Sequence, residues 1–317
     1  NGWITNSAES RASGNVDLRA SGQAPDSGVA HGIRNNGTVY AAGNTTLRAE
    51  GEIDNQDSGQ LLAAQTTQLQ AGSVINRGLI DGAITRLQTS ADAATGQVSN
   101  VGTGRLYGDL LSIQTAALVN APQTVAGVTS APVIAARQRL DLGLQTLDNS
   151  DHAVIFSAGD LAIGGQLDGS AKAVGRASTV RNGSATVEAQ GQLSIAANNI
   201  LNINDHFAYS VQLVGTQYGI REDLSSTYFR VFDRYIYEPV VTQDDPGQIV
   251  AGGDIQLRAD QITNQNSRIV AGGTLGISGT TLNNITVSAQ RRVNDVGTQW
   301  SWGVTGGHSS CWPCRWV

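Results

Sequence analysis

A tandem repeat in the C-terminal third of the chain constrains the fold more than any other feature. The twenty residues from Gly247 are GQIVAGGDIQLRADQITNQN, and the next twenty, from Ser267, are SRIVAGGTLGISGTTLNNIT. At a constant offset of 20, both copies contain Ile-Val-Ala-Gly-Gly and end near an asparagine, Asn264 or Asn284. A unit of this length is too short for the two helices of an ankyrin or TPR repeat, but it suits one coil of a β-solenoid.

Each copy also has the alternation of a strand with one buried face. Ile255 and Leu257 are separated by a polar residue, and Leu275 and Ile277 repeat this spacing. A single unit cannot bury its apolar face, whereas stacked units bury it together. We assign the Gly-Gly pairs to corners with positive φ. The pattern predicts an all-β chain folded as a parallel β-helix of about 12 coils.

Composition agrees with a solenoid and argues against some partners. The 317 residues include 38 glycines and 6 prolines, so few hydrogen-bond donors of the strand ladders are lost. Aromatic residues make up 5%, which suits a narrow lumen filled by aliphatic side chains. A net charge of −6 and a pI near 5.1 argue against nucleic acid as a partner. No apolar run is long enough for a transmembrane helix.

The repeat extends, less regularly, over most of the chain. We expect solenoid repeats in residues 1–205 and 247–290, with an aromatic-rich, hairpin-like excursion in residues 206–246 between them. An irregular C-terminal tail is expected in residues 291–317. Because the chain starts at Asn1 and contains no methionine, we expect an internal fragment of a longer protein.

Asparagine recurs at the ends of the repeat units. Stacked coils would bring these side chains above one another, where their amides can bond along the stack as a ladder. Alternatively, each asparagine serves only its own turn, since asparagine tolerates the left-handed region and forms Asx turns. Both roles are structural, and the sequence leaves them open for Asn55, Asn76, Asn120, Asn149, Asn264 and Asn284.

The excursion between His206 and Pro246 holds half of the chain's aromatic side chains and is the candidate binding region. Its alternation predicts an antiparallel pair of strands with a turn near residues 220–226. Exposed Tyr, Phe and Arg are typical of binding hot spots. The alternative is that these aromatics pack against the solenoid wall and cover it. The candidate contact residues are Tyr228, Phe229, Phe232, Arg234, Tyr235 and Tyr237.

The unit IVAGGDIQLRADQITN resembles the repeat of the filamentous haemagglutinins, large exoproteins of two-partner secretion that include the contact-dependent growth-inhibition family. The resemblance covers most of residues 15–285. It implies a right-handed β-helix filament, secreted through an outer-membrane transporter and displayed on a Gram-negative cell. It also implies adhesion to a host or neighbouring cell, or presentation of a toxin to that cell. The receptor, protein or glycan, is not specified by the sequence.

A carbohydrate-active β-helix enzyme is the alternative function. Such enzymes gather acids on one strand face over successive coils, whereas the acids here are isolated, as at Asp54, Asp81, Asp141 and Asp160. We therefore expect no catalytic residue, cofactor or metal site. Cys311 and Cys314 have CxxC spacing, but the short context favours a local disulfide or an incidental tail over a redox or zinc site.

Overall fold

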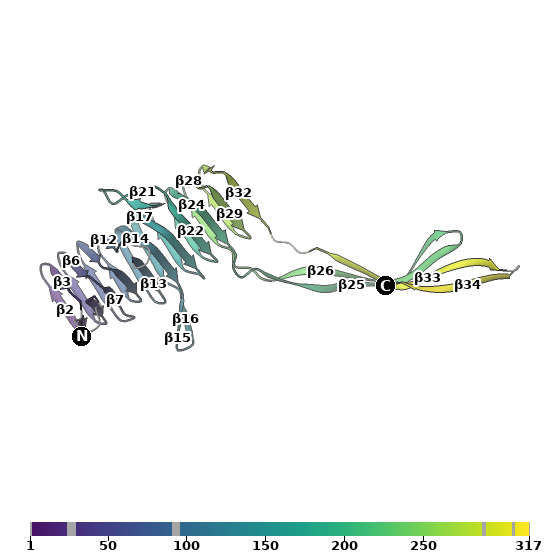
Figure 1. Ribbon diagram of the computed structural model, residues 1–317, viewed down its shortest axis with the longest axis horizontal. Coiled ribbons are helices and arrows are strands. Elements are labelled where there is room, and N and C mark those ends of the chain that lie inside the picture. The colour runs from purple at the N-terminus through teal and green to yellow at the C-terminus, as the bar shows by residue number, and fades with distance from the viewer. Residues whose placement is uncertain (1, 24–29, 91–95, 287–289, 306–307, 317) are drawn as a thin grey trace. The chain divides into compact units, whose positions relative to one another are not determined.

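A computed structural model describes residues 2–23, 30–90, 96–286, 290–305 and 308–316, with side chains described as far as Ser301. All regular secondary structure in these ranges is β-strand. The chain divides into two compact units (Figure 1). Unit 1 comprises Asn1–Asp205 and Asp245–Thr286, and unit 2 comprises His206–Asp244 and Val287–Val317.

Unit 1 is a stack of coils whose strands form three parallel walls. The first wall contains β1 (Trp3–Asn6), β4 (Gly32–Asn35), β7 (Glu52–Asn55), β10 (Ser73–Asn76), β13 (Gln97–Val101), the last parts of β14 (Arg105–Ala121) and β17 (Val133–Ser150), β22 (Ala177–Gly183), the last part of β24 (Leu193–Ile203), β29 (Gln261–Gln265) and β32 (Thr281–Ile285).

The second wall contains β2 (Glu9–Ala12), β5 (Thr38–Ala41), β8 (Gln60–Ala63), β11 (Leu79–Asp81), the first parts of β14 and β17, β18 (Val154–Ser157), β23 (Thr186–Ala189), β27 (Gln248–Ala251) and β30 (Arg268–Ala271). The third wall contains β3 (Val16–Ala20), β6 (Thr45–Ala49), β9 (Thr66–Gln70), β12 (Ile84–Gln88), the middle parts of β14 and β17, β19 (Asp160–Gly164), the first part of β24, β28 (Ile255–Arg258) and β31 (Leu275–Ser278).

This arrangement confirms the predicted all-β parallel solenoid. The first wall has eleven stacked strands, close to the expected number of coils. Ile249 lies in register with Ile269, as the offset of 20 predicts. Two short hairpins interrupt the coils, β15 (Gln123–Val125) with β16 (Val128–Ser130), and β20 (Gln166–Leu167) with β21 (Ala173–Val174).

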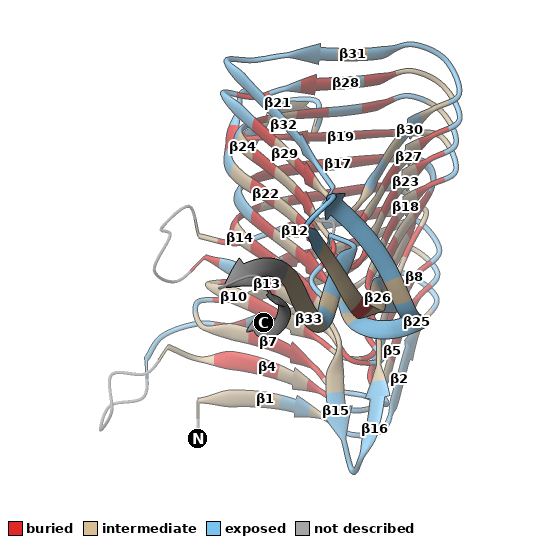
Figure 2. Ribbon diagram, turned by 90° about the vertical axis from the view of Figure 1, so that its right-hand side faces the viewer, coloured by how far each residue is buried: buried red, intermediate tan, exposed pale blue. Residues whose placement is uncertain are grey.

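The lumen is filled mainly by aliphatic side chains from alternate positions of the three walls, and Figure 2 shows buried residues along the strands of each wall. In the coil of β7, β8 and β9, these are Ile53, Leu61 and Leu69, all fully buried. Each such side chain contributes roughly 1.5–3 kcal/mol relative to an exposed one. In the last coil, β31 and β32 expose their aliphatic side chains, and Ile269 is only half-buried because no coil packs on its outer side.

The Gly-Gly pairs have a different role from the one that the sequence suggests. The prediction of positive φ is wrong for these glycines, because none of them has φ in the left-handed region. A Cβ atom on Gly252 would lie 2.4 Å from the Gln190 carbonyl oxygen, and one on Gly272 would lie 2.2 Å from the Gly252 oxygen. Glycine is therefore required because the corners of successive coils pack in backbone contact.

The asparagines of the first wall form a continuous ladder of side-chain amides. Each Nδ2 donates to the Oδ1 of the next rung at 2.7–2.9 Å, always toward the C-terminal end of the stack. The second amide hydrogen bonds a backbone carbonyl, as from Asn120 to the Val154 oxygen at 3.2 Å. Some rungs also bond a carbonyl of the turn that follows them, as from Asn264 to the Ser267 oxygen at 2.9 Å. The rungs are Asn6, Asn35, Asn55, Asn76, Asn100, Asn120, Asn149, Asn182, Asn202, Asn264 and Asn284.

Five of these rungs are absent from the sequence-based set: Asn6, Asn35, Asn100, Asn182 and Asn202. The spacing between neighbouring rungs varies from 20 to 62 residues because loops, hairpins and the whole excursion are inserted between coils. Variable spacing does not account for all of them, however, because Asn35 lies 20 residues before Asn55, Asn100 lies 20 before Asn120, and Asn182 lies 20 before Asn202. The shared signal is an aliphatic residue two positions before the asparagine, since that residue occupies the lumen in register with its neighbours.

Unit 2 is a four-stranded antiparallel sheet in the order β25 (Ala208–Ser225), β26 (Tyr228–Gln243), β33 (Arg292–Thr305) and β34 (His308–Trp316). The predicted antiparallel pair of strands is present, but residues 220–225, where the turn was expected, belong to β25, and the turn lies at residues 226–227. Residues 291–317 are not an irregular tail, however, since most of them form β33 and β34. These residues lack the 20-residue period, but β33 pairs with the edge of β26 that β25 leaves free. The side chains of Cys311 and Cys314 lie outside the described residues.

Candidate functional site

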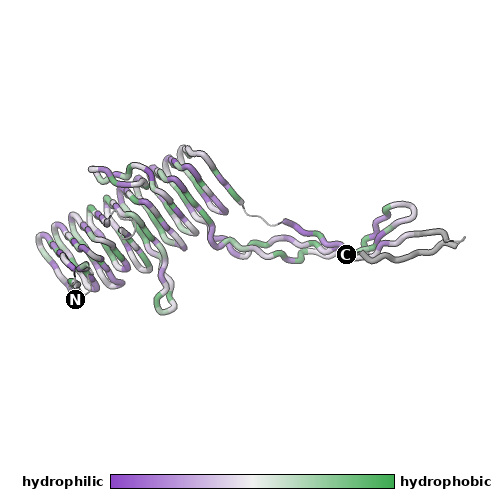
Figure 3. Tube along the Cα trace, viewed as in Figure 1, coloured by the Kyte–Doolittle hydropathy of each residue, from purple (hydrophilic) through white to green (hydrophobic). Residues whose placement is uncertain are grey.

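The candidate site is the sheet of unit 2, where successive residues of each strand point to opposite faces. Phe229, Tyr235 and Tyr237 of β26 share one face, which we call the aromatic face. Tyr228, Phe232 and Arg234 share the other, which we call the ionic face. Polar and apolar residues alternate along these strands, as Figure 3 shows for β25 and β26. The six predicted contact residues are therefore divided between two surfaces.

The ionic face is held together by charge pairs between strands. Arg234 donates from Nε and Nη2 to the two carboxylate oxygens of Asp295, both at 2.8 Å. Arg230 donates from Nε to Glu222 Oε2 at 2.6 Å. The ring of Phe232 is 2% exposed and lies 5.3 and 5.2 Å from the guanidinium carbons of Arg230 and Arg234. These contacts connect three strands, so Phe232 and Arg234 stabilise the sheet itself.

The Arg234–Asp295 pair also changes the acidity of both groups. The side-chain hydrogen bond from Arg234 lowers the pKa of Asp295 below its usual value. The same bond raises the pKa of the Arg234 guanidinium. Both shifts favour the charged forms, as is expected for a bidentate pair. The pair therefore persists over the whole physiological pH range.

On the aromatic face, rings and cations pack in pairs. Phe229 stacks on Trp300 of β33 with 6.2 Å between centroids and 10° between planes. The guanidinium carbon of Arg221 lies 4.3 Å from the Phe229 centroid, and that of Arg292 lies 4.6 Å from the Tyr237 centroid. In each of these cation–π contacts, an arginine lies over the ring and attracts it electrostatically at the surface of the sheet.

The aromatic face continues into an exposed aliphatic area that the sequence-based set missed. Leu213 lies opposite Tyr237, and Tyr209 lies opposite Val241. Tyr209, Val211, Leu213 and Val241 are 43–54% exposed. The signal was available in the strict alternation from Tyr209 to Leu213, which places three large side chains on one face. The contact surface therefore includes β25 as well as β26.

The structure places the six predicted residues in three different environments. Phe232 is buried within the sheet, and Tyr228 is exposed at the end of the ionic face. Phe229, Arg234, Tyr235 and Tyr237 are half-buried. Of these four, only Arg234 lies on the ionic face, where Asp295 binds it. Phe229, Tyr235 and Tyr237 are thus the predicted residues best placed to contact a partner together.

The isolated acids of unit 1 are held in ion pairs with arginines. Asp54 lies 2.9 Å from Arg77, and Asp81 lies 3.3 Å from Arg137. Arg139 lies between Asp141, at 2.6 Å, and Asp160, at 3.5 Å. The Arg139–Asp160 pair joins β17 to β19, the Arg139–Asp141 pair lies within β17, and the other two pairs join different coils, so the four acids have structural partners.

Glu52, in β7 of the first wall, is an acid whose pKa is raised by its surroundings. Burial raises the pKa of Glu52, and the nearby charge of Asp54 raises it further. The two acids belong to one strand, β7, and Asp54 is fixed by Arg34 and Arg77. A β-helix hydrolase would need carboxylates from successive coils, and this pair does not provide them.

Comparison with known proteins finds a family match for one part of the chain. Residues 241–290, which include β27 to β32, match the family model of the haemagglutinin repeat. The chain contains a filamentous haemagglutinin-type repeat region. This repeat is typical of structural and adhesive proteins and not of enzymes. Neither the comparison with curated proteins nor that with solved structures gives a match.

Two further features of the chain concern membranes and metals. Among the described residues, no helix is long and apolar enough to cross a membrane. In the same part of the chain, no group of three or more His, Cys, Asp or Glu side chains is arranged to hold a metal ion.

Proposed function

We propose that this chain is a structural and adhesive segment of a large secreted surface exoprotein. In this proposal the solenoid of unit 1 is the scaffold, and the aromatic face of unit 2 contacts a receptor on a host or neighbouring cell. The haemagglutinin-type repeat supports an adhesin-like segment in general. The choice of unit 2 as the contact surface rests on its exposed apolar side chains.

The main support for this contact surface is that the aromatic face combines aromatic rings and aliphatic side chains within one layer of strands. Tyr209, Leu213 and Val241 are each about half exposed, and Tyr237 lies among them. A sheet with an apolar face normally buries it against another element. Contiguous exposed apolar surface is typical of interaction sites, and rings with nearby arginines are enriched among hot spots.

The export route and the purpose of adhesion are further parts of the same proposal. Proteins with this repeat are associated with two-partner secretion, which supports export by an outer-membrane transporter to the surface of a Gram-negative cell. Presentation of a toxin to a neighbouring cell is the narrower version. Loss of surface display in cells without the transporter, and survival of target cells beside a toxin-free variant, would test these two parts separately.

The contact surface is tested by replacing its aliphatic side chains without disturbing the strands. The variant Val211→Thr, Leu213→Thr, Val241→Thr places a β-branched residue, which suits a strand, at each of the three positions. The matched control is Gln212→Thr, Gln217→Thr, because these exposed residues lie on the ionic face of the same strand. Binding to whole target cells is measured for both variants.

We expect the aromatic-face variant to lose roughly tenfold or more in cell binding, since several apolar contacts are removed together. The control should bind as the parent does. Circular dichroism shows whether each sheet is folded. Unchanged binding of a folded aromatic-face variant would contradict the proposal, and so would equal losses in the variant and the control.

A further inference from the structure

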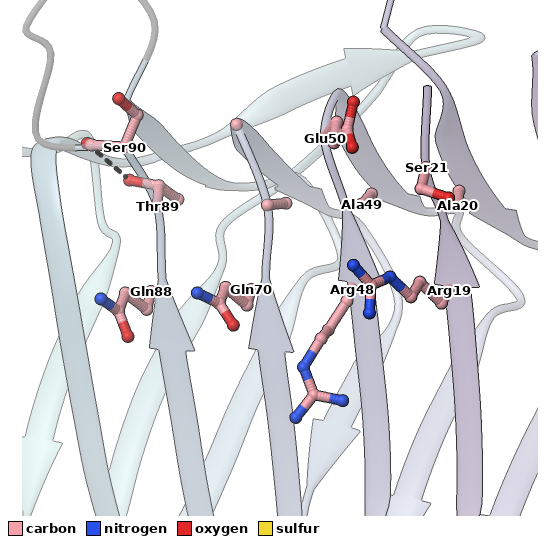
Figure 4. A pocket seen from close by; sticks show the side chains of 12 residues that line it. Arg19, Ala20, Ser21, Arg48, Ala49, Glu50, Gln70, Gln88, Thr89 and Ser90 are labelled. Atoms are coloured by element: carbon pink, nitrogen blue, oxygen red, sulfur yellow. Dashed lines mark hydrogen bonds between the residues drawn. The ribbon is translucent and has the colours of Figure 1, made fainter. Parts of the chain in front are cut away.

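The sheet of unit 2 has a long edge strand that is paired on one side only. Among the described residues, β25 pairs with β26 alone, so the backbone groups along its outer edge lack a strand partner. Strands inside the walls of unit 1 differ. Figure 4, a close view of a cavity on the third wall, shows neighbouring strands next to one another, and there β6, β9 and β12 are each paired on both edges. An unpaired edge can accept a further strand.

The length of β25 distinguishes it from the other free edges of the described strands. Each strand of the first and last coils of unit 1 has four or five residues and ends at a corner. At the other edge of the unit 2 sheet, β34 has nine residues. The strand β25 has 18 residues. A partner strand of ordinary length, about five or six residues, can therefore pair with β25 without meeting a corner.

Soluble proteins usually protect an edge strand with charged side chains, proline or bulges. In β25 the charged side chains are at positions 221–223, and two shifts of register with β26 lie within residues 217–225. Residues 208–220 contain no charged side chain and no proline. From Tyr209 to Leu213 the register with β26 is regular. The second half of the outer edge is thus protected, whereas the stretch from Tyr209 to Leu213 is not.

The side chains of this unprotected stretch suit a neighbouring strand on both faces of the sheet. Tyr209, Val211 and Leu213 are exposed on the aromatic face. Ser210 and Gln212, which alternate with them, lie on the ionic face, where Gln212 Nε2 donates to Ser210 Oγ at 3.1 Å. A strand added here would meet apolar side chains on one face and neutral polar side chains on the other.

We propose that the outer edge of β25 pairs with β25 of a second copy of this chain. The two strands would run antiparallel about a two-fold axis, which continues the antiparallel pairing of the whole unit 2 sheet. The regular stretch is centred on Val211, so Ser210 of one copy would lie opposite Gln212 of the other, and Tyr209 opposite Leu213. Like charges directly opposite each other are destabilising, and this neutral stretch brings none against itself.

The same pairing enlarges the aromatic face. A two-fold axis perpendicular to the sheet keeps equivalent faces on one side, so Tyr209, Val211 and Leu213 of both copies form one exposed surface. With the receptor contact proposed above, the dimer would hold a cell surface at two linked sites, which bind more tightly together than either does alone. The dimer itself uses the backbone groups of the edge and does not depend on that receptor contact.

A strand of a different protein is the alternative occupant of this edge. Selection of one particular foreign partner commonly uses complementary charges, which also exclude wrong partners. The unprotected stretch offers no charge for this purpose, whereas a second copy presents the same surface and matches it by symmetry. The composition of the edge therefore favours self-pairing.

The test places charges on the edge and then restores their complementarity. A lysine variant, Ser210→Lys with Gln212→Lys, brings like charges together across the dimer. A glutamate variant, Ser210→Glu with Gln212→Glu, does the same with the opposite sign. Either charge has an opposite charge near it in the monomer, because Gln212 lies opposite Glu238 and Arg291 lies 3.5 Å from the Glu238 carboxylate. Circular dichroism shows whether each variant is folded.

The matched control is Gln60→Lys with Gln256→Lys, which adds the charge of the lysine variant to exposed positions of unit 1. Analytical ultracentrifugation over a wide range of concentrations measures the dimer of each protein. We expect the parent and the control to form dimers of equal affinity. Each edge variant alone should lose roughly tenfold or more in dimer affinity. An equimolar mixture of the two edge variants should form a mixed dimer.

Three results would overturn the self-pairing. The first is a parent that stays monomeric at every concentration, which would leave the edge to a different protein. The second is a folded edge variant that dimerises as tightly as the parent. The third is a mixture of folded edge variants that forms no mixed dimer. Failure of the receptor contact is recognised separately, because a folded aromatic-face variant that binds cells as the parent does contradicts that contact whether or not dimers form.

Discussion

Unit 1 and unit 2 are both built from strands that alternate polar and apolar residues, yet they bury their apolar side chains to very different extents. In unit 1, three walls face one lumen, and side chains such as Ile53, Leu61 and Leu69 are fully enclosed. In unit 2, one layer of strands has two faces, and among its large described side chains Phe232 alone is recorded as buried. Alternation therefore predicts a strand, but it does not predict what covers the strand.

The two units also use polar side chains differently. Unit 1 buries neutral amides that bond one another along the stack, and it buries Asp54 and Asp141 only in ion pairs with arginines. Unit 2 uses half-exposed ion pairs and cation–π contacts across its strands. Buried bonds are costly to break, whereas exposed ones are weak and screened by salt. The following variants probe this difference, from the largest expected effect to the smallest.

Ile249→Asp should have the largest effect on unit 1. It places an unpaired carboxylate in an aliphatic lumen, and we expect a loss of several kcal/mol in unfolding free energy, measured by urea denaturation. Ile269→Asp should cost less, because Ile269 lies in the half-exposed last coil. Gln256→Asp, on the outward side of β28, should be tolerated. If all three variants melted alike, the assigned inward register would be incorrect.

Replacing a rung of the asparagine ladder should have the next largest effect. Asn120→Leu leaves the Nδ2 of Asn100 and the Oδ1 of Asn149 without their side-chain partners inside the stack. Each unsatisfied buried group costs about 1–3 kcal/mol, so a total of about 2–6 kcal/mol is expected in the same denaturation measurement. Asn284→Leu is the control, since this rung is exposed. Comparable losses would mean that the ladder adds little beyond local turn bonding.

A glycine of the corner row should show an intermediate effect. Gly252→Ala places a methyl group 2.4 Å from the Gln190 carbonyl oxygen. Crowding of this kind costs about 1–3 kcal/mol, because the two coils must separate locally. Gly169→Ala is the matched control, since nothing lies within 4 Å of its added methyl. A thermal shift that is the same for both variants would contradict the close-packing explanation.

The smallest effect is expected in unit 2, from Asp295→Asn. Arg234 lowers the pKa of Asp295, so the stabilisation is fully present above the unfolded-state pKa of about 3.9 and is lost as pH falls through the lower folded-state pKa. Four of the five tryptophans lie in unit 2, so acid titration of tryptophan fluorescence reports on it. The variant should lack the Asp295 step, and added salt should reduce the difference. Identical acid profiles would show that the pair does not stabilise the sheet.

The sequence by itself determined the scaffold. An offset of 20 residues with aliphatic residues at alternate positions leaves few ways to bury those side chains other than stacking, and Ile249 and Ile269 are in register as the offset requires. The repeated asparagines bond one another from coil to coil along the first wall. These features could be predicted because neighbouring coils repeat the same local pattern, so each coil shows what the next one contacts.

Only the tertiary structure decided the features that depend on which strands meet. The role of Gly252 follows from the Gln190 carbonyl, 62 residues earlier in the chain, and not from its own φ. The sequence suggested Arg234 as a contact residue, whereas in the structure it binds Asp295, which lies 61 residues later in the chain. Residues 292–316 have no repeat, and their strands form because β26 offers a free edge. Such long-range partners leave no local period in the sequence, so alternation could mark the candidate surface of unit 2 but not the pairs that hold it.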